Sequence, residues 1–373
     1  MIYNGQILTS ENQTCGYLAE LKRNDIDALV IIPTNWVEPP VLLRHVHDFK
    51  HLPLILWGFP ETDEYLDKGL FLGSSSAYAV IKGALEQMDI KHECIMGLPS
   101  NIETKNRAEL VLSNISASIE LARSKIGLIG YNSMGIYTAT FDQLSIKKHF
   151  GVEIDCMADS YIVTEMMNNI SDADCMELRE RFGCGYVLMP DAEKSFNLPL
   201  KMYLTLKKLI CEGNWNALSV KCQHEFTSYL GCAACLPLSM LTDEGIMCSD
   251  EGDVHAVLTM LIAKTVTEAD LFFGDIYPYN HNRFLMGHCG LVPHECGEPG
   301  CTITLNEMDK RISRDGLTTG GIVSTLTYRS GDVTLARIEG RRDSGYRMHI
   351  AEGRASPARS VGHNFSNVEV ELD

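Results

Sequence analysis

The sequence lacks an excess of positive charge. Its 373 residues include 49 acidic and 32 basic side chains, which gives a formal net charge of −17. It also has no block of basic residues interleaved with aromatic ones. Because such a chain repels the phosphate backbones of DNA and RNA, we expect no nucleic-acid partner.

Long apolar segments are also missing. No apolar run approaches the roughly 18 residues that span a bilayer. The N-terminal stretch MIYNGQILTSENQ has neither the basic start nor the apolar middle of a secretory leader. We therefore expect a cytoplasmic protein with no membrane partner.

Cysteine is not scarce, but a disulfide framework is not indicated. The 13 cysteines are odd in number and scattered through a long chain, which favours reduced thiols. An alternative is a structural zinc ion, although the spacings fit no standard zinc ribbon. Its ligands would come from the C-x-x-C pair Cys232 and Cys235 and from the crowded segment with Cys289, His294, Cys296 and Cys301.

The order of apolar and helical patterns predicts an α/β fold. Apolar runs at 27–34 and 52–60 alternate with helical patterns, and KIGLIGYNSMG at 125–135 restarts this alternation. The G-x-G-x-x-G spacing of a dinucleotide site is absent, so we expect no organic cofactor. Beyond residue 300, short alternating stretches rich in β-branched residues indicate antiparallel strands.

We therefore predict two doubly wound, Rossmann-like α/β domains followed by a C-terminal antiparallel β domain or barrel. The predicted boundaries are 1–124 for the N-terminal α/β domain, 125–265 for the second, which carries Glu251, and 266–373 for the mainly β domain. The length suits two or three domains.

Two acidic residues are the best candidates for chemistry. Glu251 is expected to open a helix whose apolar face includes Val254, Val257, Leu258 and Leu261, so that its carboxylate lies at the positive end of the helix dipole. Asp275 is expected to end the apolar strand LFFGD. Each alone fits an ordinary helix-start or turn acid equally well. Together, one helix and one strand apart, they suit a divalent ion such as Mn²⁺ or Mg²⁺.

Three stretches resemble a known family. D-E-G-D-V-H-A-V-L-T-M-L followed by F-F-G-D is similar to the metal-binding region of L-fucose isomerase and its relatives. SMGIYTATFDQL at 133–144 resembles the start of the family's second domain, and ALSVKCQ with LSMLTDEG resembles its sugar-binding core. The resemblance to the L-fucose and L-arabinose isomerase superfamily covers most of residues 27–363.

The resemblance implies an aldose–ketose isomerase that converts a free monosaccharide through an ene-diol. It implies Mn²⁺ or another divalent cation held by Glu251, Asp275 and His363, with Glu251 and Asp275 also carrying protons. It further implies a homo-oligomer, a trimer or hexamer. Relatives often carry a histidine pair where this chain has His363 and Asn364, and the chain ends ten residues after His363. The alternative is therefore a catalytically impaired sugar-binding or regulatory paralogue.

Further residues are candidates for substrate contact. His288 in MGHCG is a candidate metal ligand or substrate contact, as the equivalent histidine is in arabinose isomerases. Lys221 and Gln223 follow ALSV and are expected to bind sugar hydroxyls. Ser133 and Met134 are expected to line the entrance to a neighbouring subunit's site. Polar residues at strand ends are more often simply solvated, which is the alternative for each of them.

Overall fold

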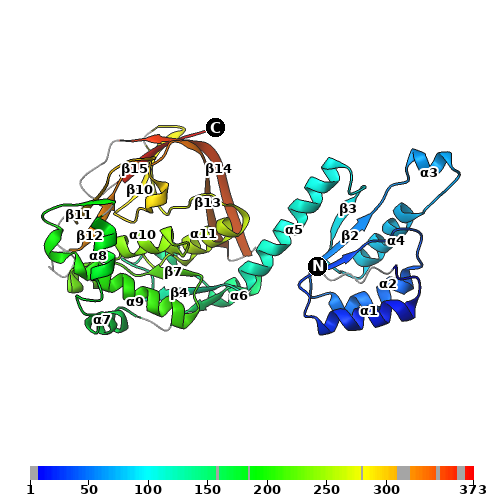
Figure 1. The fold of residues 1–373 in the computed structure, drawn as a ribbon, viewed down its shortest axis with the longest axis horizontal. Helices are drawn as coiled ribbons and strands as arrows, with labels where there is room; N and C mark the ends of the chain where they lie inside the picture. Colours follow the sequence, from blue (N-terminus) through cyan, green and yellow to red (C-terminus); the bar gives the residue numbers. More distant parts are fainter. Residues whose placement is uncertain are drawn as a thin grey trace. The chain divides into compact units, whose positions relative to one another are not determined.

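The fold was analysed in a computed structural model. It describes residues 7–156, 159–183, 185–278, 280–308, 320–341, 345–358 and 366–373, with backbone alone at 44, 45 and 181–183. The chain forms two compact units, Met1–Ile119 and Glu120–Asp373 (Figure 1). None of the helices in these described ranges is both long and apolar enough to cross a bilayer.

The first unit is built around a small parallel sheet. Its strands β1 (Leu29–Ile31), β2 (Leu54–Gly58) and β3 (Glu93–Met96) pair in the order β1-β2-β3. The helices are α1 (Glu11–Arg23), α2 (Pro39–Val46), α3 (Asp63–Asp67), α4 (Ser74–Gln87) and most of α5 (Ile102–Ala122). A short 3-10 helix, η1 (His47–Phe49), follows α2. The core forms where α1 and α4 pack apolar side chains against β1 and β2.

A second parallel sheet forms the centre of the second unit. Its strands β4 (Lys125–Ile129), β5 (Glu153–Asp155), β7 (Ala217–Val220) and β8 (Met247–Ser249) pair in the order β5-β4-β7-β8. Strands β7 and β8 are buried throughout, as expected for strands with helices on both faces. Figure 1 shows α9 (Asn197–Gly213) and α11 (Val254–Val266) on opposite sides of β4 and β7.

Shorter elements complete this part of the unit. The helices are α6 (Gln143–Phe150), α7 (Ser160–Asn168), α8 (Met176–Gly183) and α10 (Cys235–Asp243). The single-turn elements are η2 (Tyr137–Ala139), η3 (Glu193–Ser195), the π-helical η4 (Glu225–Leu230) and η5 (His294–Cys296).

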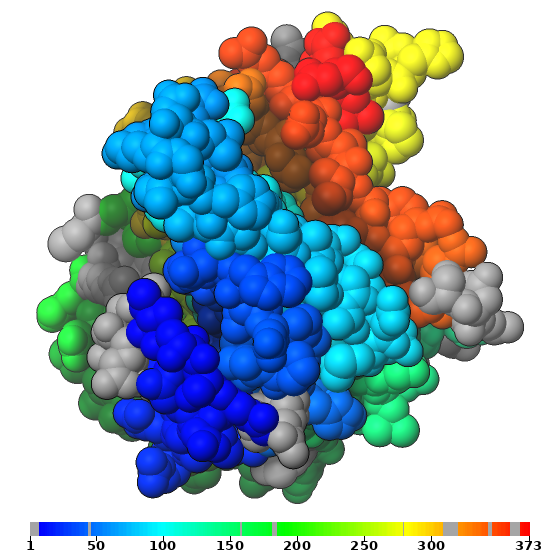
Figure 2. All heavy atoms as spheres, turned by 90° about the vertical axis from the view of Figure 1, so that its right-hand side faces the viewer, coloured from blue at the N-terminus to red at the C-terminus, as the bar shows by residue number. Residues whose placement is uncertain are grey.

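The remaining strands of the second unit form two further sheets. The five-stranded antiparallel sheet has the order β13-β14-β15-β10-β9, from β9 (Asp275–Pro278), β10 (Arg283–His288), β13 (Gly331–Arg341), β14 (Gly345–Pro357) and β15 (Ser366–Leu372). A three-stranded sheet joins β12 (Ile322–Thr325), β11 (Ile303–Glu307) and β6 (Tyr186–Leu188). Strands β13 and β14, in orange, form part of the surface in Figure 2.

The parallel sheets and the separate antiparallel sheet confirm the prediction of a mixed α/β protein. Strand β6 pairs in parallel with β11, so the segment after residue 300 adds strands to a sheet shared with the α/β part. The second and third predicted domains both lie within the unit Glu120–Asp373.

The prediction that Glu251 opens a helix is wrong. Helix α11 begins at Val254, and Asp253 caps it by accepting a hydrogen bond from the Ala256 amide at 2.9 Å. Glu251 and Gly252 have positive φ angles of 61° and 69°, which a helix does not allow. Glu251 therefore lies in the turn between β8 and α11.

The prediction that Asp275 ends a buried strand is also wrong. Residues 271–274 form no strand, and Asp275 instead begins β9, an exposed strand that pairs with β10. The apolar side chains of this stretch pack into cores rather than into a sheet, with Phe272 and Phe273 joining different clusters. Burial of these rings accounts for the apolar run that had indicated a strand.

Candidate metal and active site

Three side chains that can bind a metal ion meet between the two large sheets of the second unit. Asp250 and Glu251 follow the carboxyl end of β8, and His288 is the last residue of β10. One ligand atom from each of the three lies within 4.8 Å of the other two. The carboxyl edge of the parallel sheet and the end of an antiparallel strand thus supply the group together.

The backbone that carries Asp250 and Glu251 is held firmly. The Ser133 amide donates to the Glu251 carbonyl at 2.7 Å, and the Gly252 amide donates to the Val220 carbonyl at 3.1 Å. A Cβ at Gly252 would lie 2.0 Å from the Tyr131 carbonyl oxygen, so only glycine fits there. The left-handed conformation of Glu251 is a strain typical of functional sites.

Asp250 is the most unusual member of the group. Its side chain is 0% exposed, and neither carboxylate oxygen accepts a hydrogen bond from the described residues. The nearest charged partner is His288, whose Nε2 lies 3.2 Å from Asp250 Oδ1. The Nδ1 of His288 is likewise buried without a hydrogen bond from any described residue. Such groups are costly to bury unless a ligand satisfies them.

The pKa values of the group reflect burial and crowding of charge. Burial raises the pKa of Asp250 well above its usual range, against the opposing effect of His288. Burial lowers the pKa of His288, but the negative charge of Asp250, together with Cys289 and Asp275, outweighs this effect and raises the pKa to about 10. Burial raises the pKa of Glu251, and the charge of Asp275 adds to the rise. Burial and the crowding of acidic groups thus disfavour ionisation of the two carboxyl groups, whereas His288 favours its protonated form.

The residues fit a divalent cation. Two carboxylates and an imidazole are the oxygen and nitrogen donors that suit Mn²⁺ and similar ions. A cation would also satisfy the oxygens of Asp250 that accept no hydrogen bond from the described chain. An ordinary acidic turn has exposed carboxylates. This group differs from one because the oxygens of Asp250 are buried without a hydrogen bond from the described residues.

Asp275 lies beside this group without belonging to it. Its carboxylate accepts a hydrogen bond from the Tyr277 hydroxyl at 3.2 Å, and burial together with this carboxylate raises the pKa of Tyr277 to about 12. Its charge also raises the pKa values of Asp250 and Glu251. Asp275 is exposed, whereas Asp250 is not. Joint metal binding by Glu251 and Asp275 stays a prediction.

The residues expected to bind substrate lie near Glu251. The Ser133 hydroxyl donates to the Gln223 carbonyl at 2.6 Å, and Thr227 donates to the side-chain oxygen of Gln223 at 2.8 Å. Lys221 forms an ion pair with Glu225 at 2.6 Å. Met134 is 53% exposed and has a φ of 51°. Their roles toward a sugar stay predictions.

The expected third ligand cannot be placed. His363, with Asn364, lies outside the described residues. His288, which the sequence left open between metal ligand and substrate contact, lies with Asp250 and Glu251 in a group that could hold a metal ion. The residue that sequence reasoning missed is Asp250. A signal was present, because Asp250 directly follows the apolar strand MCS, and acids after buried strands of parallel sheets face the ligand crevice.

The zinc alternative is only partly supported. Among the described residues, Cys235 and Cys289 form a group with Asp250, whereas His294, Cys296 and Cys301 join no such group. His294 is engaged elsewhere: its Nδ1 lies 2.8 Å from the Tyr186 hydroxyl and 3.0 Å from Asp243. Of the residues proposed for zinc, only Cys235 and Cys289 thus lie together in such a group among the described residues.

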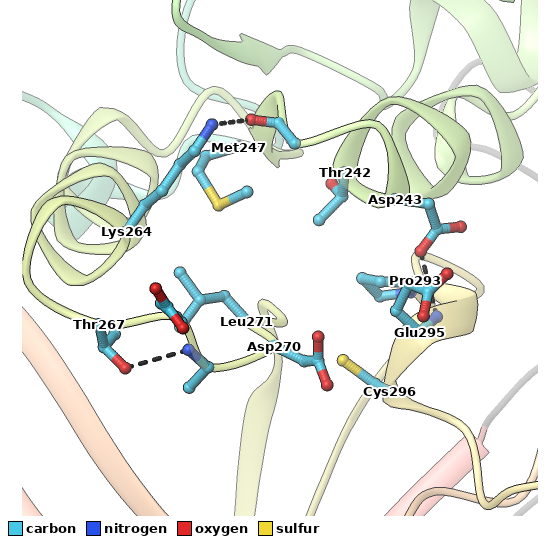
Figure 3. A pocket seen from close by; sticks show the side chains of 13 residues that line it. Thr242, Asp243, Met247, Lys264, Thr267, Asp270, Leu271, Pro293, Glu295 and Cys296 are labelled. Atoms are coloured by element: carbon cyan, nitrogen blue, oxygen red, sulfur yellow. Dashed lines mark hydrogen bonds between the residues drawn. The ribbon is translucent and has the colours of Figure 1, made fainter.

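A groove of about 310 Å³ lies at the other end of β8, beside Met247 and the end of α11 (Figure 3). Two of its acidic side chains are engaged: Asp243 accepts from the His294 amide at 2.7 Å, and Asp270 pairs with Arg329 at 2.9 Å. Lys264 donates to the Gly245 carbonyl. This groove therefore lacks the unsatisfied buried groups of the Asp250 site.

The chain is similar to named isomerases along its whole length. It is 22% identical to the sulfoquinovose isomerases of Priestia aryabhattai and Priestia megaterium, over 99% of this chain and 80% of each relative. The sulfoquinovose isomerase of Alkalicoccus urumqiensis is 21% identical over 98% of this chain and 80% of its own length. No protein-family model matches the chain.

Proposed function

We propose that this chain is a metal-dependent isomerase that converts a free aldose into its ketose through an ene-diol intermediate. One observation carries the proposal: Asp250, Glu251 and His288 lie together beside Asp275, and the oxygens of the buried Asp250 accept no hydrogen bond from the described residues. The chain around it is similar over nearly its full length to sugar isomerases.

The isomerase part of the prediction is confirmed by these relatives. Four similar proteins share the name sulfoquinovose isomerase, and three of them match at least 98% of this chain. The chain is thus a sugar isomerase of the aldose–ketose type. The metal, its ligands and the particular sugar remain parts of the proposal.

The proposed chemistry moves hydrogen between neighbouring carbons and oxygens of the sugar. A carboxylate base takes the proton from C2 of the aldose, and an acid protonates O1, which gives the ene-diol. Loss of the proton from O2 and protonation of C1 then give the ketose. We assign these transfers to Glu251 and Asp275. Burial raises the pKa of Glu251, which favours a carboxyl group that must both accept and release a proton.

In this proposal, Asp250 and His288 help to bind the metal ion. With Glu251 they would hold a divalent cation such as Mn²⁺, joined by His363 and Asp275, the ligands that the resemblance implies. Such a cation, when bound, supplies positive charge that stabilises the developing negative charge on the sugar oxygens. Asp250 also orients His288, since the carboxylate lies 3.2 Å from Nε2 and both side chains are fully enclosed.

We further propose the predicted arrangement of two wound α/β domains, 1–124 and 125–265, and a β domain at 266–373, in a cytoplasmic homo-oligomer. The separate five-stranded antiparallel sheet supports the β domain. Light scattering coupled to size-exclusion chromatography tests the oligomer, for which a trimer or hexamer is expected and a monomer would contradict the proposal.

An assay of ketose formation tests the activity. Purified protein with Mn²⁺ is incubated with sulfoquinovose, glucose, fucose and arabinose, and we expect turnover of at least one, with sulfoquinovose tried first because similar proteins are named for it. Glu251→Gln and Asp275→Asn should each lower kcat by about 10²- to 10⁴-fold. The matched control Glu268→Gln, an exposed residue of the distant groove, should keep wild-type activity. Thermal stabilisation by a sugar without ketose would instead indicate an impaired paralogue.

A further inference from the structure

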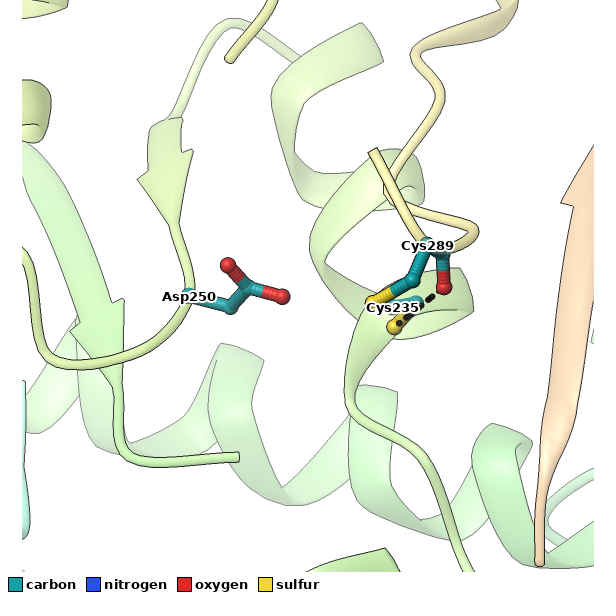
Figure 4. A group of neighbouring side chains, drawn as sticks. All are labelled: Cys235, Asp250 and Cys289. Carbon is teal, nitrogen blue, oxygen red and sulfur yellow. Dashed lines mark hydrogen bonds between the residues drawn. The ribbon is translucent and has the colours of Figure 1, made fainter. Parts of the chain in front are cut away.

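Two thiols lie on another side of Asp250. Cys235 begins α10 and is buried, and Cys289 directly follows β10 and is half-buried. The Cys235 thiol donates to the Cys289 carbonyl oxygen at 3.3 Å. Both sulfur atoms and one oxygen of Asp250 lie within 4.8 Å of one another, and Figure 4 shows the carboxylate directed toward the two cysteines.

We propose that Cys235, Cys289 and Asp250 form a second cation site, selective for thiophilic divalent ions such as Zn²⁺. This site is distinct from the one proposed for isomerisation, because two of its three ligands are sulfur. The two sites share Asp250.

Ligand chemistry supports this assignment. Two thiolates and a carboxylate are a donor set for zinc, whereas Mn²⁺ and Mg²⁺ prefer oxygen and nitrogen. Ligand atoms bound to one tetrahedral zinc ion lie about 3.3–3.8 Å apart, as follows from bond lengths of about 2.0–2.3 Å. Atoms already within 4.8 Å therefore need to move by only about 1 Å. Each thiol gives up its proton to the solvent as its sulfur binds the ion.

A second observation points to a ligand independently of the cysteines. Asp250 is 0% exposed, and its two oxygens accept no hydrogen bond from the described part of the chain. His288 Nε2 lies 3.2 Å from Oδ1. A single cation on the His288 side leaves an oxygen of Asp250 directed at the thiols, and a thiophilic ion there would satisfy it.

The chain offers a close control for this site. Cys232 is the other cysteine of the C-x-x-C pair and is as deeply buried as Cys235. Its thiol lies 3.7 Å from the Ala233 carbonyl, and it belongs to neither of the two metal-capable groups among the described residues. A serine at position 232 thus removes a buried thiol of the same segment without removing a proposed ligand.

Cobalt titration of the metal-stripped full-length protein tests the proposal. Co²⁺ should produce a near-ultraviolet thiolate-to-cobalt absorption band that one equivalent of Zn²⁺ removes. Cys235→Ser and Cys289→Ser should each weaken Zn²⁺ binding by more than about tenfold and abolish the band. Cys232→Ser should leave both unchanged.

Absence of the band in the wild-type protein would overturn the second site. So would a band in both Cys235→Ser and Cys289→Ser that is as intense as in the wild type. If Cys235→Ser does not fold by circular dichroism, Cys289→Ser decides, because residue 289 is only half-buried. The readout requires no turnover of sugar. Failure of the zinc site and failure of the proposed isomerase activity are therefore separate results.

Discussion

A buried carboxylate without hydrogen bonds from the described residues is the residue-level feature that sets Asp250 apart. Asp250→Asn keeps the shape of the side chain but removes the charge that a cation would neutralise. We therefore expect Mn²⁺ affinity to fall by about 10- to 100-fold, the range typical when a ligand's partner or support is lost. Isothermal titration calorimetry measures it. Asp332→Asn, a 92% exposed aspartate, should bind Mn²⁺ as the wild type does, and unchanged affinity in Asp250→Asn would contradict the site.

His255 gives the fold a pH dependence of its own. Burial lowers the pKa of His255 below the usual 6.5, because the effect of burial is larger than that of the neighbouring charges. The groups facing it are Asp253 on its own helix, Arg337 and Glu339 on β13, and the ring of Tyr346 on β14. Since the folded state favours neutral His255, the unfolded chain binds more protons below about pH 6.5. The stability that His255 contributes is present above that pH and is lost as the pH falls.

Urea denaturation at a series of pH values checks this sign. Between pH 7.5 and 5, the free energy of unfolding should fall more for the wild type than for His255→Gln. His349→Gln replaces an exposed histidine and should follow the wild type. Parallel curves for the wild type and His255→Gln would show that His255 does not carry the dependence.

At the same scale, the local backbone explains why the sequence did not reveal Asp250. Asp250, Glu251 and Asp253 lie within four residues, and the position of Asp250 directly after the strand MCS is a signal that does not by itself settle which of the three is buried. The left-handed φ of Glu251 and the close approach of Gly252 to Tyr131 determine which acid is buried. With this backbone, Asp250 turns inward and Asp253 caps α11. Tyr131 is more than a hundred residues away in the chain, so this constraint is a tertiary one.

Among the elements, helix α11 joins the two large sheets of the second unit. Thr259 makes two bonds with its hydroxyl, donating to the His255 carbonyl at 2.7 Å and accepting from the Ile338 amide of β13 at 2.9 Å. The Arg337–Asp253 ion pair, 2.7 Å long, adds a second link between these elements. The position of the β13–β14 hairpin thus depends on polar contacts with one helix face.

Thr259→Val should destabilise the unit by about 1–3 kcal/mol, because the buried Ile338 amide loses its acceptor. Chemical denaturation with circular dichroism measures the change. Thr242→Val is the matched control: this hydroxyl is equally buried and donates to the Leu238 carbonyl within its own helix. A loss in Thr259→Val no larger than in Thr242→Val would show that the link to β13 contributes little.

Elements that follow from the pattern of neighbouring residues could be predicted from the sequence. Elements that depend on contacts between residues far apart in the chain could not. The runs at 27–34 and 52–60 contain β1 and β2, because an apolar run is a property of neighbouring residues. The apolar stretch at 271–274 has the composition of a strand but no partner to pair with, and its rings fill cores. His288 could not be joined to Asp250, since their meeting depends on how β10 lies against the end of β8.

At the scale of the whole molecule, all the described residues of the candidate site lie in one of the two units. Asp250, Glu251, Asp275 and His288 all belong to the unit Glu120–Asp373. The first unit has its own parallel sheet and its own core. We therefore expect binding of a cation to stabilise the second unit directly, whereas the first unit gains nothing from ligands that it does not supply.

Hydrogen exchange followed by mass spectrometry tests this expectation. Mn²⁺ at about 100 times its dissociation constant should stabilise the binding unit by about 2.7 kcal/mol. Exchange should slow in β8, α11 and β10, and peptides of β1, β2 and α4 should exchange at the same rate with and without the ion. A chelator should reverse the protection. In Glu251→Gln the protection should be largely lost, while Glu268→Gln should retain it. Equal protection in both units would contradict a metal site confined to the second, and protection in neither would contradict the metal site itself.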